Sequence, residues 1–143
     1  MGTRGSDIFQ DDDAMDWLEA FKAGPAVAVV SALAAVETEA PGAFLDRGVA
    51  VPALAAGEAL ATALGRPAAG LGDDVRATLE AAAAAVARAE VDPHRAAQVV
   101  ARAGGEDSEK GNPTNWFRPD DHAAFRATVA DLHQRLATGE AIT

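Results

Sequence analysis

The sequence predicts an all-α fold: a compact bundle of about six helices with a docked N-terminal arm, forming a single helical domain over residues 1–143. Three observations predict it. Alanine, the strongest helix former, supplies 37 of the 143 residues. Apolar residues recur at spacings of three and four, which gives a helix one apolar face. No segment alternates apolar and polar residues as a half-buried strand does.

Residues 1–10 contain two glycines and no periodicity, so we expect an irregular arm whose Phe9 packs on the body of the protein. The first helix should begin at Asp11-Asp12-Asp13. An aspartate at the N-cap accepts a hydrogen bond from a free amide, and further acids favour the helix dipole. One apolar stripe predicts the residues of this helix that enter the core, which are Ala14, Trp17, Leu18 and Phe21.

Proline and glycine separate the next three predicted helices. The second should cover residues 25–39 and stop before Pro41-Gly42, and the third should cover residues 52–64. The fourth should begin at the acidic pair Asp73-Asp74 and continue as one helix through an alanine run. Its stripe is Val75, Leu79, Ala82 and Val86.

The C-terminal third should contain two helices around one polar loop. Asp92-Pro93 should open a helix that Gly104 closes. Residues 105–115 (GEDSEKGNPTN) have a turn-forming composition, so we expect a polar, mobile loop. The last helix should cover residues 119–139, and its predicted core stripe is Phe125, Val129, Leu132 and Leu136.

The charge balance excludes some partners. Twenty-two acidic residues against twelve basic ones give a net charge of −10. This argues against binding to nucleic acid or to an anionic membrane, and favours a basic protein as partner. The most apolar stretch is much shorter than the roughly 20 residues of a membrane span. The chain has no cysteine, which fits a cytoplasmic location.

The start of the chain resembles a family of small bacterial proteins. Members of that family begin Met-Gly-Thr-Trp-Gly and continue with a phenylalanine, an Asn-Asp pair and Asp-Trp-Leu. The matching residues here are Met1-Gly2-Thr3, Gly5, Phe9, Asp12, Ala14 and Asp16-Trp17-Leu18, with further similarity at Ala55-Ala56-Gly57-Glu58, Leu64-Gly65-Arg66-Pro67 and Trp116. The family is catalogued as domain of unknown function 4259. Arg4 replaces its tryptophan and Asp11 its asparagine. The resemblance implies one small domain and brings no known activity.

Motifs for catalysis or metal binding are missing from the sequence. His94, His122 and His133 lack the i, i+4 spacing of a zinc-binding helix, and there are no thiolates. No serine lies in a Gly-x-Ser-x-Gly elbow, and there is no phosphate-binding glycine loop. We therefore predict no catalytic, cofactor-binding or metal-binding residue and no cofactor.

Glu58 is the most informative single residue, because it is the only charged residue in the predicted helix 52–64. A carboxylate among apolar neighbours lies at the edge of the apolar face or is buried with hydrogen-bond partners. One interpretation is a structural tether for backbone amides, those of the N-terminal arm included. The other is an acid in a functional site.

Trp116, Phe117 and Arg118 close the polar loop, just before the last helix. They could form a hydrophobic lid over the start of that helix. The alternative is an exposed aromatic and arginine anchor, a composition enriched at binding hot spots. Together with Glu58 and Trp17, Trp116 and Arg118 are the candidate interaction or structural residues.

Two functions of different classes fit these patterns. The first is a non-catalytic protein-binding or regulatory domain, of which a toxin-neutralising protein is one form. The alternative is a small carboxylate-based hydrolase or a ligand-binding helical bundle. A cleft with convergent carboxylates would favour the second, and a flat acidic face would favour the first.

Overall fold

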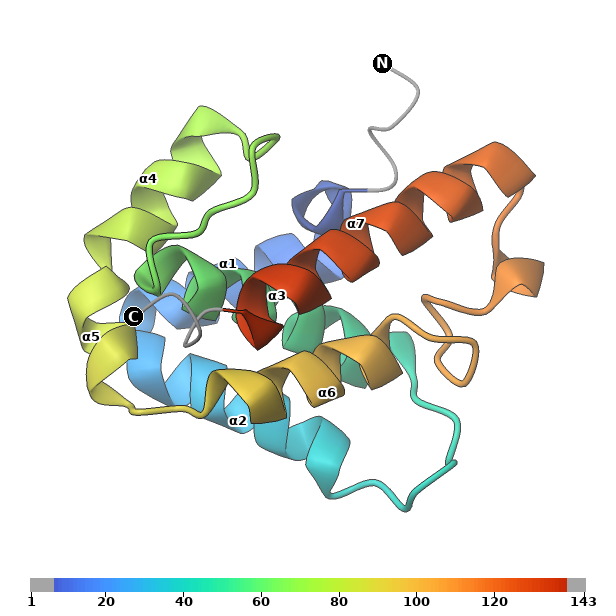
Figure 1. Cartoon of the computed structure of the whole chain (residues 1–143), viewed down its shortest axis with the longest axis horizontal. Coiled ribbons are helices and arrows are strands. Elements are labelled where there is room, and N and C mark those ends of the chain that lie inside the picture. The colour runs from blue at the N-terminus through green and yellow to red at the C-terminus, as the bar shows by residue number, and fades with distance from the viewer. Residues whose placement is uncertain (1–6, 139–143) are drawn as a thin grey trace.

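The computed structural model describes residues 7–138, which form seven α-helices and two short 3-10 helices without a strand (Figure 1). Helix accounts for 70% of the chain, so the all-α prediction is confirmed. The elements are η2 (Ile8–Gln10), α1 (Asp12–Ala23), α2 (Pro25–Glu37), α3 (Arg47–Ala63), α4 (Asp73–Ala81), α5 (Ala83–Arg88), α6 (Pro93–Ala103), η3 (Pro113–Asn115) and α7 (Pro119–Ala137).

Helix α3 forms the centre of the bundle and contacts η2 and the other six α-helices (Figure 1). Every residue from Ala53 to Thr62 is buried. Most of them are alanine or glycine, so the neighbouring helices approach closely. A Cβ atom added to Gly57 would lie 2.6 Å from Val100 Cγ2 of α6. The core is therefore built largely from close helix contacts around small residues.

The predicted docking of the N-terminal arm is confirmed for the part that the structure describes, although Ile8–Gln10 forms a short 3-10 helix instead of irregular backbone. Asp11 is the N-cap of α1, where its side chain accepts a hydrogen bond from the Asp13 amide at 2.8 Å. The stripe of Ala14, Trp17, Leu18 and Phe21 is buried. Ile8 is buried and Phe9 is half-buried against the core, so the arm is docked. Residues 1–6, which include Arg4, lie outside the described residues.

Helix α3 begins at Arg47, earlier than the predicted start at Pro52, and Pro52 lies inside the helix. A proline there removes one backbone hydrogen bond. Two other features compensate for the lost hydrogen bond. Ala50 and Val51 are buried in the core, and the Arg47 amide donates to Glu109 Oε1 at 3.0 Å. The helix is thus capped by a residue far away in the sequence, which a local pattern does not reveal.

The predicted fourth helix is two helices, because the backbone bends at Ala82 (φ −100°, ψ 4°). Leu79 and Val86 are both fully buried, as the stripe predicts. The bend lets α5 pack on α2 as well as on α3, whereas α4 packs on α3. A tertiary contact with α2 therefore interrupts a run that local propensity alone would continue.

Segment 105–115 is a loop, but it is anchored to the body of the protein. Ser108 is fully buried. The Leu45 amide donates to the Asp107 carbonyl at 2.8 Å, and the Glu109 amide donates to the Leu45 carbonyl at 2.7 Å. These contacts argue against the mobility that its polar composition predicts.

Helices α2 and α7 end slightly before their predicted ends, at Glu37 and Ala137. Within residues 7–138, no helix has both the length and the apolar character needed to cross a membrane. The cytoplasmic location and the exclusion of nucleic acid stay predictions.

Candidate functional site

Glu58 lies on α3 in the middle of the core, with its side chain only 2% exposed. Arg135 of α7 meets it with two parallel hydrogen bonds. Nη2 donates to Oε1 at 2.8 Å and Nη1 donates to Oε2 at 3.0 Å. This paired geometry matches the planar guanidinium to the planar carboxylate, and it is among the stronger side-chain interactions in proteins.

The loop after α3 completes the surroundings of this ion pair. Glu58 Oε2 also accepts from the Ala68 amide at 3.1 Å, and Arg135 Nη1 donates to the Arg66 carbonyl at 2.8 Å. Arg135 Nε donates to Asp131 Oδ2 at 2.9 Å. Burial would lower the pKa of Arg135, but hydrogen bonding and attraction to Glu58 and Asp131 outweigh it and raise that pKa. Among the described residues, the donors to Glu58 thus come from α3, α7 and the loop after α3 rather than from the N-terminal arm.

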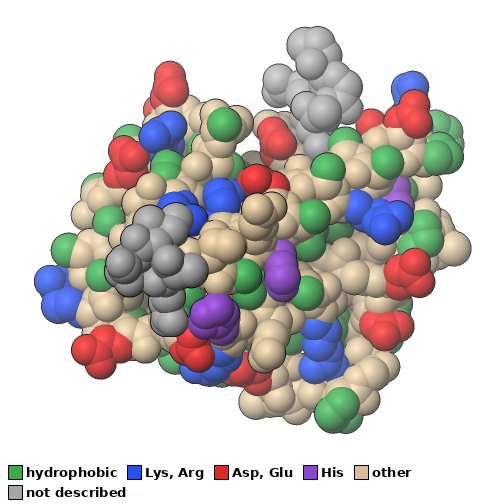
Figure 2. Space-filling view, in the orientation of Figure 1, with side chains coloured by type: hydrophobic (Ala, Val, Ile, Leu, Met, Phe, Trp, Pro, Cys, Tyr) green, Lys and Arg blue, Asp and Glu red, His purple; other side chains and the backbone are tan. Residues whose placement is uncertain are grey.

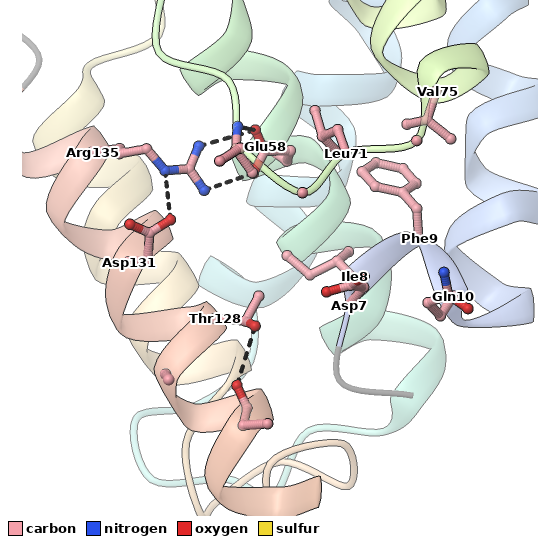
Figure 3. Close-up of a pocket in the computed structure, with 16 residues that line it drawn as sticks. Asp7, Ile8, Phe9, Gln10, Glu58, Leu71, Val75, Thr128, Asp131 and Arg135 are labelled. Carbon is pink, nitrogen blue, oxygen red and sulfur yellow. Dashed lines mark hydrogen bonds and ion pairs between the residues drawn. The ribbon is translucent and has the colours of Figure 1, made fainter. Parts of the chain in front are cut away.

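A cleft opens beside this ion pair, between the arm, the loop before α4, and α7 (Figure 3). We call it the arm cleft, and its volume is about 560 Å³. Its apolar lining comes from Ile8 and Phe9 of η2, Leu71 and Val75 near the start of α4, and Ala124 and Ala127 of α7. Its polar lining includes Asp7, Glu58, Thr128, Asp131 and Arg135. The fold therefore brings Glu58 to the wall of a cleft that it shares with the arm, the loop after α3 and α7.

A second buried carboxylate, Asp11, holds a separate group that we call the Asp11 cluster: Asp11, Asp13, Arg47 and Lys110. The Asp11 side chain is 2% exposed, and its Oδ2 accepts from Lys110 Nζ at 2.9 Å and from Arg47 Nη2. Arg47 Nε also donates to Asp13 Oδ2 at 3.2 Å. Burial raises the pKa of Asp11, but hydrogen bonds from Lys110, the Asp13 amide and Arg47, with the charge of Lys110, bring it below its ordinary value of 3.8.

Sequence reasoning missed the cluster and found only part of the role of Asp11. The Asp-Asp-Asp run predicts a helix cap, and Asp11 does cap α1. Its second oxygen binds two cations that the fold brings from the start of α3 and from the polar loop. Lys110 gave no signal beyond its presence in a polar segment.

The structure divides Trp116, Phe117 and Arg118 between the two interpretations offered for them. Trp116 is half-buried, with its ring centroid 5.1 Å from that of Phe125, and its Nε1 donates to the Lys110 carbonyl at 2.7 Å. The Phe117 side chain is fully exposed, and Arg118 is exposed as well. Trp116 thus serves as the packed lid, while Phe117 and Arg118 have the exposure expected of an anchor.

Trp17 lies apart from the arm cleft and the Asp11 cluster. It is buried, its ring packs 5.1 Å from Phe21, and its Nε1 approaches the Ala28 carbonyl at 3.4 Å. These contacts are those of a core residue.

Within residues 7–138, no group of three or more His, Asp or Glu side chains is placed to hold a metal ion. His122 and His133 show how far apart such side chains lie. His122 Nε2 lies 2.8 Å from the Gly111 carbonyl, and His133 is half-buried about three turns further along α7.

Comparison with known proteins identifies a family. Neither the curated proteins nor the solved structures contain a match to the chain. One family model, described as a domain of unknown function, matches residues 2–112. The match covers most of the chain and includes Asp11, Glu58 and Lys110, but it ends before Trp116. The chain therefore belongs to the family of domain of unknown function 4259 (DUF4259), as its N-terminal signature predicts.

Proposed function

We propose that this protein is a non-catalytic binding domain that docks a basic protein partner at the corner formed by Trp116, Phe117 and Arg118. The observation that carries the proposal is the full exposure of the Phe117 ring. A fully exposed phenylalanine contributes nothing to the apolar core, and contact with a partner would remove its apolar surface from water.

The backbone that presents Phe117 is firmly held. Trp116, the preceding residue, packs on Phe125 and is hydrogen-bonded to the Lys110 carbonyl. The Lys110 ammonium lies 4.9 Å from the centroid of Trp116 and 5.4 Å from that of Phe125, within the range of a cation–π contact. The same ammonium is bound to Asp11. Because the backbone at Phe117 is already held in place, less conformational entropy is lost when a partner binds.

Charge supports a basic partner. The chain carries a net charge of −10, and Asp120 and Asp121 lie in the first turn of α7, directly after the corner. Figure 2 shows hydrophobic, acidic and basic side chains together at the end of the molecule where α7 begins. Such a surface can steer a basic partner towards an aromatic anchor. Arg118 adds exposed donors for a carbonyl or carboxylate of that partner.

A regulatory protein, of which a toxin-neutralising protein is one form, would act by covering the surface through which its partner functions. Within this proposal the protein acts in the bacterial cytoplasm. A carboxylate-based hydrolase is the less supported alternative, because Glu58 already engages both carboxylate oxygens with Arg135 and the Ala68 amide. The ligand-binding alternative has the arm cleft in its favour and leads to the inference of the next subsection.

The test compares Phe117→Ser with Phe44→Ser, since Phe44 is a second exposed phenylalanine, at 53% exposure. Each variant and the unaltered chain are immobilised and exposed to a lysate of the native host. The captured protein is identified, purified and titrated against all three chains. Phe117→Ser should weaken binding about 30-fold, the loss expected of a hot-spot aromatic, while Phe44→Ser should bind like the unaltered chain. Equal affinities for Phe117→Ser and the unaltered chain would refute the proposal.

A further inference from the structure

We propose that the arm cleft binds a small molecule made of an apolar body and one protonated amine. This site lies at the arm, α4 and α7, and it includes none of Trp116, Phe117 and Arg118. Its volume of about 560 Å³ falls within the range of small-molecule sites.

The apolar part of the ligand is recognised by the walls of the cleft. Ile8 and Phe9 form one side, and Leu71 and Val75 form the side facing them (Figure 3). Ala127 of α7 is exposed and adds apolar surface without filling the space. Phe9, Leu71 and Val75 are only partly buried, so a bound apolar group would remove more of their surface from water.

The charge of the lining favours a cation. Two carboxylates of the lining, those of Glu58 and Asp131, share one guanidinium, that of Arg135. Glu58 and Arg135 neutralise each other in a closely paired contact. The charge of Asp131 therefore remains in excess in this group of three side chains, which opposes an anionic ligand.

Asp131 provides the specific contact for the amine. One of its oxygens accepts from Arg135, while its side chain remains 61% exposed, so the other oxygen faces solvent. Thr128 lies one turn earlier on the same face of α7, and its hydroxyl donates to the Ala124 carbonyl at 3.1 Å. That hydroxyl oxygen retains acceptor capacity. An ammonium group can thus donate to Asp131 and Thr128 together while its apolar body lies between Ile8, Phe9 and Leu71.

The experiment uses three probes with the same apolar body: 3-phenylpropylamine, 3-phenylpropanol and 3-phenylpropionate. Each is titrated into the full chain at millimolar concentrations, and binding is followed by amide chemical shifts. The amine should bind about tenfold more tightly than the alcohol, and the carboxylate should bind more weakly than both. Equal affinities for the three probes, or no saturable binding of the amine, would overturn the proposal.

Variants locate the site. Asp131→Asn should remove the preference for the amine but leave the affinity of the alcohol unchanged. Ala127→Leu should abolish binding of both, because it fills the cleft from an exposed position. Glu80→Gln is the matched control, since Glu80 is also an exposed carboxylate bonded to an arginine one turn away, but it lies outside the cleft. Retention of the amine preference in Asp131→Asn would overturn the assignment, provided that its unfolding midpoint matches that of Glu80→Gln. Phe117→Ser should bind all probes normally, which separates this result from that for the protein partner.

Discussion

Glu58 and Asp11 are both carboxylates with 2% exposed side chains, yet the fold uses them differently. Glu58 belongs to a two-sided contact in which one arginine occupies both of its oxygens. Asp11 divides its oxygens, with one capping α1 and the other binding Lys110 and Arg47. Glu58 lies in the middle of a core helix, and Asp11 lies where a helix begins.

This difference determines how each residue can respond to substitution. Loss of Glu58 removes the carboxylate paired with both terminal nitrogens of Arg135, a side chain that is itself only 14% exposed, and leaves it the contact of Nε with the exposed Asp131. Loss of the Asp11 charge still leaves Arg47 its contact with Asp13 and its 40% exposure to solvent. The cost at Asp11 is therefore concentrated on Lys110, with 10% exposure. We expect the Glu58 pair to contribute more to stability than the Asp11 cluster.

The largest expected effect is that of Glu58→Ala. Glu58→Ala leaves the buried Arg135 with the exposed Asp131 and the Arg66 carbonyl in place of a buried carboxylate, so the free energy of unfolding should fall by about 3–5 kcal/mol, as for other buried ion pairs that lose one partner. Glu58→Gln should lose most of the same amount, because the amide NH₂ would face the N–H groups of Arg135. The measurement is chemical denaturation at neutral pH.

The double variant Glu58→Leu/Arg135→Met shows whether the loss of stability in Glu58→Ala comes from the broken charge pair or from the lost side-chain volume. Replacing both charges by apolar groups of similar volume should recover most of the stability lost in Glu58→Ala. A Glu58→Ala chain within about 0.5 kcal/mol of the unaltered protein would behave like a surface substitution and would contradict the buried contact.

The sequence allowed different parts of the two sites to be predicted, because a local pattern records burial but not the distant partner of a charged residue. The fold class and the helix stripes were predictable, because the apolar spacing along each helix records which face is buried. Glu58 could be singled out because a lone charge among apolar neighbours requires a partner, but its partner Arg135 could not be identified. Arg135 has a local explanation, a pair with Asp131 one turn away, and that explanation is true but incomplete.

Asp11 shows the opposite case, in which a correct local explanation hides a distant one. An aspartate before a helix is adequately explained as a cap, so nothing in the sequence suggests Lys110 or Arg47. The start of α3 was mispredicted for a related reason, because Glu109 caps it from another segment. The arm cleft likewise depends on the packing of η2, α4 and α7, whose contacts are set by the whole fold.

An intermediate effect is expected for Asp11→Asn, which restores the residue that the family pattern carries there. Asparagine can still cap α1, but it loses the charge that binds Lys110, so unfolding should become easier by about 1.5–3 kcal/mol at neutral pH. The pKa of Asp11 is lowered in the folded protein. Its contribution is therefore present above its ordinary pKa of 3.8 and is lost as the pH falls through the lower folded value.

The difference in unfolding free energy between Asp11→Asn and the unaltered chain should thus be constant near neutral pH and shrink below pH 3.8. Asp12→Asn is the control, because Asp12 is the exposed acid next to it in the first turn of α1. Denaturant titrations from neutral to acidic pH measure both variants. A difference that stays constant through the acidic range would show that the charge of Asp11 contributes nothing.

The smallest expected effect concerns an exposed ion pair that, like Glu58 with Arg135, has two parallel hydrogen bonds, although here they come from Nε and Nη2 of the arginine. Arg95 donates through Nε to Glu37 Oε2 at 2.7 Å and through Nη2 to Oε1 at 2.5 Å. The hydrogen bond from Arg95 lowers the pKa of Glu37. Their side chains are 45% and 34% exposed, so water competes for both ions and salt screens them. A double-mutant cycle with Glu37→Gln and Arg95→Gln should give a coupling of only about 0.2–1 kcal/mol, which decreases with added salt. A coupling as large as that of Glu58 with Arg135 would mean that paired geometry, and not burial, sets the strength of these contacts.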